Sequence, residues 1–333
     1  MIMTRVVFTC GDINGIGPEI ALKAFKNIFS KKHTNKILFV CPENVFEHYY
    51  KLTKASFEYR FVENNNYSNS SLNLIRLPGA KLKFGFPTKI SGQIAFDSIK
   101  KSIELINHNL ADALVTAPIS KEAFSLAKNS FPGHTELLAA SEKNNNYMML
   151  FLSDKIKAGL LTIHIPISKV SKLITKEKLV SAIELLNKTA KQDLKILNPK
   201  IAVLGLNPHA GENGLIGNEE IRIINPVIKS LQKKINVSGP YVPDAFWGNK
   251  SYKNFDLILG MYHDQVLIPF KLLNFDNGVN FTAGLKLIRT SPDHGTAYDI
   301  AGLNKADESS IMQSYKYAIN IFNNRKSFIA ASK

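Results

Sequence analysis

The sequence predicts an α/β protein whose sheet is largely parallel or mixed. Short apolar runs, such as residues 5–10 and 201–206, are bounded by polar turns and are typical of buried strands. Helical patterns lie between these runs, and the clearest begins at Thr175 with apolar residues repeating on one face. Strand, polar turn and helix alternate along the chain, which is the pattern of α/β folds.

The length and composition agree with a soluble, reduced protein. A chain of 333 residues exceeds the size at which one hydrophobic core stops growing, so one large or two smaller domains are expected. No apolar run approaches the roughly 20 residues of a membrane span, and the first residues lack a signal-peptide layout. Cys10 and Cys41 both end strand-like runs, which favours a cytoplasmic chain without disulfides.

The net charge of +15 is typical of proteins that bind nucleic acid. The lysines, however, are dispersed along the chain among asparagines, and they form no dense basic run with interleaved aromatic residues. A solvated, lysine-rich surface is the favoured interpretation. A basic nucleic-acid-binding protein is the remote alternative, and steep salt-dependent retention of DNA or RNA would reveal it.

Residues 260–302 concentrate ionisable and amide side chains between apolar, strand-like runs. Buried without partners, each such group would cost a few kcal/mol, so their density indicates a site for an anionic ligand. The side chains concerned are His263, Asp264, Lys271, Asn280, Arg289, Asp293, His294 and Asp299.

Three histidines stand in the same relation to three predicted strands. His164, His209 and His263 each lie at, or within three residues of, the C-terminal end of an apolar run. In α/β sheets these strand ends share one edge, where ligands bind. Three neutral imidazoles with open positions suit a catalytic divalent ion, and the ligand type favours zinc. The alternative is that each is a separate capping or core histidine.

Two further groups suit an anion. His134 and Thr135 precede a predicted helix, whose free backbone N–H groups favour negative charge, although Thr135 also suits a plain N-cap. Lys271 and Arg289 flank Asn280, and two cations with an amide suit a phosphate or carboxylate. Surface salt bridges are the alternative for this second group.

Two glycine clusters invite comparison with phosphate-binding turns. Residues 11–17 lack the third glycine of the dinucleotide fingerprint, so packing beneath a helix is the favoured role. Residues 211–217 precede Glu219 and Glu220. This second cluster either cradles a group or makes a tight surface turn.

Nine segments together resemble the 4-hydroxythreonine-4-phosphate dehydrogenase family of pyridoxal phosphate biosynthesis. They follow one another in order from Gly11 to Gly302, so the resemblance covers nearly the whole chain. The segments are GDINGIGPEI, VTAPISKEA, PGHTELLA, TIHIP, LNPHAGENGLIGNEE, GPYVPDAF, MYHDQ, GVNFTAGL and RTSPDHGTAYDIAG.

The resemblance implies a fold similar to the isocitrate and isopropylmalate dehydrogenases. That fold has two α/β domains around a cleft and no classical Rossmann domain, which agrees with the missing dinucleotide fingerprint. On this basis residues 1–95 with 275–333 are expected to form one domain. Residues 96–274 are expected to form the second, which carries much of the metal site.

The resemblance also assigns roles to individual residues. It implies that His164, His209 and His263 bind a divalent metal, zinc in preference to magnesium or cobalt. The residues expected to bind the substrate are His134, Thr135, Lys271, Asn280 and Arg289. The turn expected to bind NAD or NADP consists of Asp293, His294, Gly295, Thr296 and Ala297. Asp244 and Asp264 are the candidate proton carriers, although either is equally suited to orienting a metal-binding histidine.

The implied reaction is NAD(P)-dependent oxidation of 4-phosphohydroxy-L-threonine. The product, 2-amino-3-oxo-4-phosphooxybutanoate, then loses CO2 to give 3-amino-2-oxopropyl phosphate. The family is dimeric, so a homodimer with its active site at the subunit interface is expected. A paralogue acting on another phosphorylated hydroxy acid, such as 4-phosphoerythronate, remains open. Dehydrogenases for isopropylmalate-like diacids bind their metal with carboxylates, so the histidines count against them.

Overall fold

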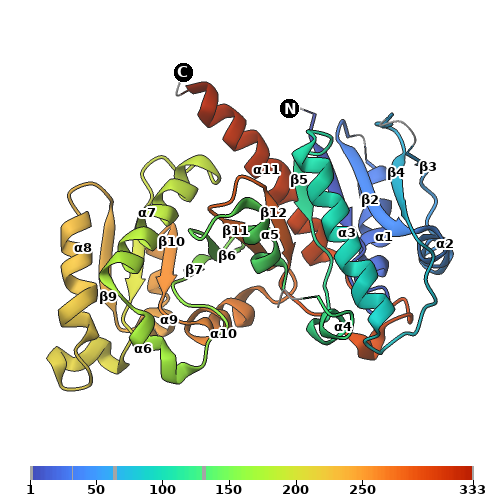
Figure 1. Ribbon diagram of the computed structural model, residues 1–333. Helices are drawn as coiled ribbons and strands as arrows, with labels where there is room; N and C mark the ends of the chain where they lie inside the picture. The colour runs from blue at the N-terminus through green and yellow to red at the C-terminus, as the bar shows by residue number, and fades with distance from the viewer. Residues whose placement is uncertain (1–2, 32, 63–65, 130–132, 332–333) are drawn as a thin grey trace. The chain divides into compact units, whose positions relative to one another are not determined.

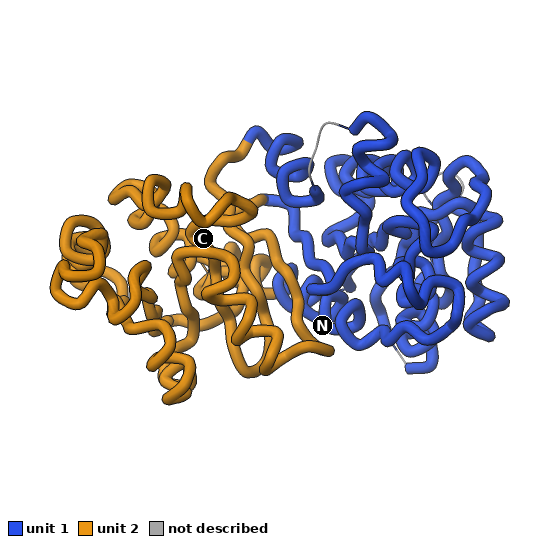
Figure 2. Tube along the Cα trace, turned by 90° about the horizontal axis from the view of Figure 1, so that it is seen from below, with its two compact units in different colours: residues 1–143, 286–323 blue, residues 144–285, 324–333 orange. Residues whose placement is uncertain are grey.

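The computed structural model describes residues 3–31, 33–62, 66–129 and 133–331. Two compact units divide the chain (Figure 2). Unit 1 comprises residues 1–143 and 286–323, and unit 2 comprises residues 144–285 and 324–333. Within the described ranges, no helix combines the length and apolar character needed to cross a membrane.

Unit 1 is a parallel sheet covered by helices (Figure 1). Its strands run in the order β3-β4-β2-β1-β5-β12, and every pairing between these neighbours is parallel. The strands are β1 (Arg5–Thr9), β2 (Lys36–Pro42), β3 (Tyr59–Phe61), β4 (Leu72–Leu77), β5 (Ala113–Val115) and β12 (Arg289–Pro292). The helices are α1 (Gly17–Phe29), α2 (Glu43–Leu52), α3 (Lys89–Asn107), α4 (Lys121–Leu126), α5 (His134–Glu142), η5 (Tyr298–Ile300) and the first part of α11 (Ser309–Ala331).

Unit 2 has a mixed sheet in the order β11-β6-β7-β10-β8-β9. β6 is antiparallel to both of its neighbours, whereas β7, β10, β8 and β9 are parallel. The strands are β6 (Met148–Leu152), β7 (Lys157–Leu160), β8 (Ile201–Leu204), β9 (Val237–Tyr241), β10 (Leu257–Gly260) and β11 (Val279–Ala283). The helices are η1 (Ile167–Lys169), α6 (Val170–Leu173), α7 (Lys176–Gln192), η2 (Pro208–Gly214), η3 (Glu220–Ile224), α8 (Asn225–Leu231), α9 (Pro243–Gly248), η4 (Ser251–Asn254) and α10 (His263–Asn274).

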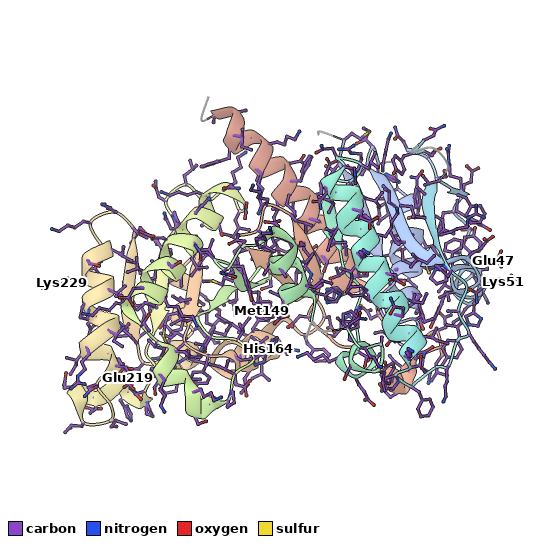
Figure 3. The ribbon with its side chains drawn as sticks, in the orientation of Figure 1. Glu47, Lys51, Met149, His164, Glu219 and Lys229 are labelled. Atoms are coloured by element: carbon purple, nitrogen blue, oxygen red, sulfur yellow. The ribbon has the colours of Figure 1, made fainter. Side chains whose placement is uncertain are left out.

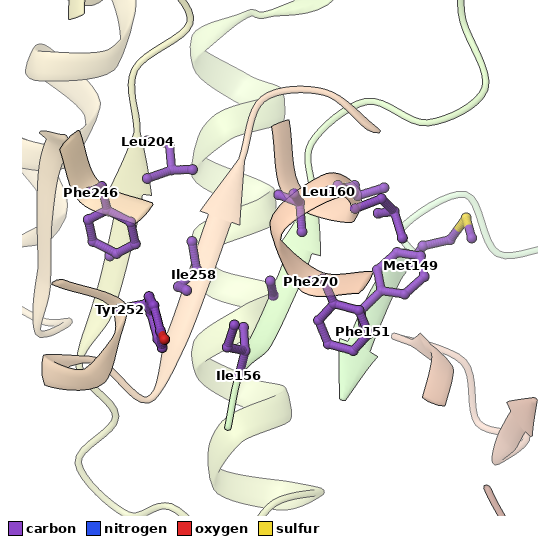
Figure 4. Close-up of a cluster of buried hydrophobic side chains, with 13 residues drawn as sticks. Met149, Phe151, Ile156, Leu160, Leu204, Phe246, Tyr252, Ile258 and Phe270 are labelled. Carbon is purple, nitrogen blue, oxygen red and sulfur yellow. The ribbon is translucent and has the colours of Figure 1, made fainter. Parts of the chain in front are cut away.

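The core of unit 2 fixes the direction of α10. Phe270 is fully buried, and its ring centroid lies 5.6 Å from that of Phe151 on β6 (Figure 4). Val266 and Leu267 belong to the same cluster of buried side chains. Burying a side chain of this size contributes roughly 1.5–3 kcal/mol each. The helix is therefore anchored along its inner face, and His263 at its first residue has a defined position.

The predicted α/β class is confirmed, and so is the helix that begins after Thr175, whose hydroxyl accepts the backbone N–H of Lys178 at 3.2 Å. Two strand ends were predicted too late. β7 ends at Leu160, where its ladder with β10 ends, and β8 ends at Leu204, where its ladder with β9 ends. His164 and His209 consequently lie in loops further beyond their strands than the sequence predicted.

The units also differ from the expected domain boundaries. Residues 96–143 belong to unit 1, because β5 pairs with β1. Residues 275–285 belong to unit 2, because β11 pairs with β6. The last ten residues also belong to unit 2, where the Arg325 guanidinium donates to the Asp193 carboxylate at 2.7 Å. Long-range strand pairing decides these boundaries, and no composition change marks them.

Candidate functional site

Unit 2 places the three candidate metal ligands after three neighbouring parallel strands. β10 pairs with β7 on one side and with β8 on the other. His164 follows β7, His263 follows β10 and His209 follows β8. All three side chains therefore come from the carboxyl-end edge of one sheet, where open α/β sheets bind their ligands.

His164 and His263 line one pocket of about 250 Å³, together with Tyr262 and Asp264 (His164 is labelled in Figure 3). Their ring centroids lie 5.9 Å apart. The Nδ1 atom of His263 lies 2.7 Å from Oδ1 of Asp264, so Nδ1–H donates to the carboxylate. This arrangement leaves Nε2 of His263 as the electron-pair donor, which is the usual state of a histidine that binds metal.

His209 lies on a turn with an unusual backbone. From His209 to Asn213 every residue has positive φ, between 42° and 84°. This left-handed region costs L-residues roughly 1–2 kcal/mol each, so it persists only where surrounding contacts hold it. Within the described ranges, no three or more His, Cys, Asp or Glu side chains lie together in positions that could hold a metal ion. One chain thus gathers His164 and His263, with His209 on the neighbouring loop.

Unit 1 contains a buried cation. Arg289, the first residue of β12, is 3% exposed, and its Nε donates to the Thr116 hydroxyl at 2.9 Å. Burial lowers the pKa of Arg289 to about 9, while Glu136 favours the charged form. The guanidinium is therefore a cation at neutral pH in a poorly solvated place. An anion that reaches it gains more than it would from an exposed arginine.

His134 and Thr135 begin α5 close to this cation. Burial, and then the positive charge of Arg289, hold the pKa of His134 well below its ordinary value, so its imidazole is neutral at pH 7. The His134 Nε2 atom is buried and has no hydrogen-bond partner among the described residues. Thr135 is buried at the same helix N-terminus. Pro132, part of the PGHTELLA segment, lies outside the described ranges.

Lys271 and Asn280 belong to unit 2. Lys271 is in the last turn of α10, and Asn280 is on β11. The Asn280 Oδ1 atom is buried without a hydrogen-bond partner among the described residues, which is the state expected of an atom that meets a ligand. Because Arg289 lies in unit 1, the cations on either side of Asn280 in the sequence belong to different units.

The turn from Asp293 to Ala297 packs on the first glycine cluster. The backbone N–H of Ile16 donates to the Thr296 carbonyl at 3.0 Å. A Cβ atom added to Gly15 would lie 2.7 Å from that same oxygen. Close packing thus accounts for this glycine without a bound phosphate.

Asp12 was not singled out from the sequence. It is fully buried, and its Oδ2 accepts the hydroxyls of Ser91 at 3.1 Å and Tyr298 at 2.9 Å. Burial raises the pKa of Asp12. The carboxylate therefore ties the glycine-rich loop to α3 and to the end of the 293–297 turn. Its place in a turn directly after a buried strand was the available signal.

The two candidate proton carriers are both exposed at helix N-termini. Asp264 contacts His263, as described above. Asp244 lies in the first turn of α9.

Comparison with known proteins decides the family. Residues 32–318 match the family of the pyridoxal phosphate biosynthetic protein PdxA. The chain belongs to the PdxA family. A relative named 4-hydroxythreonine-4-phosphate dehydrogenase from Bacteroides thetaiotaomicron is 40% identical over 97% of this chain and 90% of its own length. A protein of Oceanobacillus iheyensis, provisionally named D-threonate 4-phosphate dehydrogenase, is 35% identical over 94% of this chain and 96% of its own.

Solved structures of PdxA-family proteins share the fold. A 4-hydroxythreonine-4-phosphate dehydrogenase from Klebsiella pneumoniae superposes with a TM-score of 0.82, at 34% identity over 96% of this chain and 98% of that chain. The TM-score is 0.83 for a Salmonella typhimurium protein provisionally named 4-hydroxythreonine-4-phosphate dehydrogenase, with 35% identity over 96% of this chain and 100% of that one.

Proposed function

We propose that this PdxA-family chain oxidises 4-phosphohydroxy-L-threonine with NAD or NADP, and that the product then loses CO2 to give 3-amino-2-oxopropyl phosphate. The observation that carries the proposal is the buried Arg289 beside the N-terminus of α5, since a phosphorylated substrate needs such an anion pocket. The relatives' names give the substrate class, and their alignment covers nearly the whole chain.

The substrate's phosphate and carboxylate are assigned to five side chains. Arg289 supplies charge, and the neutral His134 offers Nε2 to a substrate oxygen or hydroxyl. Thr135 adds a hydroxyl at the helix N-terminus. In unit 2, Lys271 supplies a second cation and Asn280 offers its buried amide. His134 and Asn280 discriminate against a substrate that lacks their partners, because Nε2 of His134 and Oδ1 of Asn280 would then stay buried without a hydrogen bond.

A divalent metal, with zinc preferred over magnesium or cobalt, is assigned to His164, His209 and His263. Bound there, it supplies Lewis-acid chemistry at the substrate hydroxyl and at the ketone that oxidation produces. The three side chains suit this role because they are imidazoles after neighbouring strands. Asp264 then orients the His263 ring through Nδ1, which leaves Asp244 as the preferred proton carrier.

The cofactor's adenosine is assigned to the turn of Asp293, His294, Gly295, Thr296 and Ala297. Two observations support a fixed turn: Ile16 binds the Thr296 carbonyl, and Tyr298 donates to the buried Asp12. A turn anchored at its C-terminal end is partly preorganised for binding, so less ordering entropy is lost when the cofactor arrives.

A second copy of the chain is proposed to complete the site. The outer face of α10 carries Ile268, Leu272 and Phe275, which are 59%, 81% and 78% exposed. Their spacing puts them on one face of the helix that begins with His263. Exposed apolar faces of this kind mark interfaces. In light scattering, Leu272→Glu should shift the protein to monomer and lower activity; an unchanged dimer would contradict this interface.

One alternative substrate has specific support. The Oceanobacillus relative, whose name specifies D-threonate 4-phosphate, matches this chain over a similar length. That substrate class shares the phosphate and the secondary hydroxyl but lacks the amino group. 4-Phosphoerythronate belongs to the same class, so all three compounds belong in one assay.

The deciding experiment measures NADH or NADPH formation by the purified protein with each of these substrates. We expect 4-phosphohydroxy-L-threonine to give the highest kcat/KM, and a chelator to abolish the activity. A higher kcat/KM for D-threonate 4-phosphate or 4-phosphoerythronate would show that this compound is the preferred substrate and would contradict the proposed reaction. Full activity in the presence of a chelator would exclude a metal from the proposed reaction. An unchanged metal content in His209→Ala would exclude His209 from the proposed ligands.

A further inference from the structure

The loop from Gly205 to Glu220 is built around one buried carboxylate. Glu220 is 1% exposed and begins η3. Its Oε1 accepts the backbone N–H groups of Leu206 and Asn207, both at 2.8 Å. Its Oε2 accepts Nδ2 of Asn207 at 2.9 Å. One side chain therefore satisfies three donors at the point where the chain leaves β8.

The second glycine cluster packs around this carboxylate. A Cβ atom on Gly211 would lie 2.8 Å from Oε2 of Glu220. A Cβ atom on Gly217 would lie 2.5 Å from Nδ2 of Asn207. Such distances exclude any side chain at these two positions unless the side chain of Glu220 or Asn207 moves away. The glycines thus cradle a group, as one interpretation of the sequence held, and that group is the chain's own Glu220.

The anchored residue leads directly into the strained turn. The carbonyl of Asn207 accepts the backbone N–H of Ala210 at 3.0 Å, which closes the chain around Pro208 and His209. Proline restricts its own φ, so little freedom remains between the anchor and His209. His209 has φ 51° and ψ 24°, a conformation that a free loop would leave.

We propose that Glu220 is a positioning residue, which holds His209 in its left-handed conformation and so sets the direction of its imidazole toward the metal. This inference rests on the proposed function, in which His209 is a metal ligand. Without the carboxylate, the turn relaxes to right-handed or extended backbone. The left-handed turn must then form again before the His209 imidazole can bind metal. The apparent metal affinity is then the intrinsic affinity multiplied by the fraction of molecules that keep the competent turn.

The test is cobalt binding by the chelator-treated full-length protein, followed by visible absorbance. Glu220→Gln should weaken Co²⁺ binding about tenfold or more and change the absorption spectrum, because partners that orient ligands typically matter by about 10–100-fold. Glu219→Gln is the matched control. Its carboxylate accepts the same Asn207 Nδ2 at 2.8 Å, and it should stay within about twofold of wild type.

Two further variants make every outcome decisive. His209→Ala should lose tight Co²⁺ binding; if it does not, the proposed ligand set fails, whatever Glu220 does. If His209→Ala loses Co²⁺ while Glu220→Gln binds as wild type does, the positioning role is refuted. Thermal unfolding without metal identifies variants that do not fold. Failure of both Glu220→Gln and Glu220→Asp to fold would show a global structural role and would also overturn the proposal.

Discussion

Replacing Arg289 by methionine tests the anion pocket most directly. Arg289 is 3% exposed and donates to Thr116 at 2.9 Å. The substitution removes the desolvation cost of the guanidinium, but it also takes away the partner of the Thr116 hydroxyl and the positive charge near Glu136. Without substrate, we therefore expect Arg289→Met to lower the free energy of unfolding by about 1–3 kcal/mol.

Substrate binding should respond very differently. A hydrogen bond to a charged group contributes about 1.5–3 kcal/mol, and a guanidinium offers a phosphate two of them. Loss of both costs about 3–4 kcal/mol at the lower end of that range, which corresponds to a fall of about 100- to 1000-fold in kcat/KM. Most of the fall should lie in KM if the contact is equally strong in the ground state and the transition state.

The assay is steady-state NADH formation with 4-phosphohydroxy-L-threonine, combined with thermal unfolding with and without substrate. Arg76→Met is the control, because Arg76 also lies in unit 1 but is exposed beside Glu43. A kcat/KM within about threefold of wild type for Arg289→Met would refute the buried anion pocket. A large loss of stability without substrate would show that Arg289 is mainly structural.

Three further variants test other groups. Because the pKa of His134 is low in the folded protein, the imidazole binds a proton in the unfolded chain at a pH where it stays neutral in the folded one. The free energy of unfolding is therefore lost as pH falls below about 6.5. His134→Gln should make Tm depend less on pH in that range. Tyr298→Phe removes a donor to Asp12, so it should cost about 1–2 kcal/mol and raise KM for NAD severalfold, whereas an unchanged KM would separate the turn from the cofactor. Arg325→Met leaves Asp193, 3% exposed, as a buried charge, and urea unfolding should show a loss of about 3 kcal/mol.

Local patterns predicted the elements well. The apolar face after Thr175 and the buried run at β1 depend on periodicity over a few residues, which the sequence displays directly. Strand ends were less predictable, because β7 stops where its pairing with β10 stops. The His164 and His209 loops are correspondingly longer than the apolar runs indicated.

The candidate site divides in the same way. The sequence by itself determined which side chains are present at the strand ends, including the imidazoles of His164, His209 and His263. Only the tertiary structure decided that His164 and His263 line one pocket, because β7 and β10 are neighbours in the sheet.

The tertiary structure also decided the environment of each group. Arg289 is a buried cation because β12 pairs with β5, and Asp12 joins three segments that are far apart in the sequence. The left-handed turn at His209 depends on the distant carboxylate of Glu220. Burial and long-range hydrogen bonds depend on which elements pack together, so the chain acquires them only when it folds.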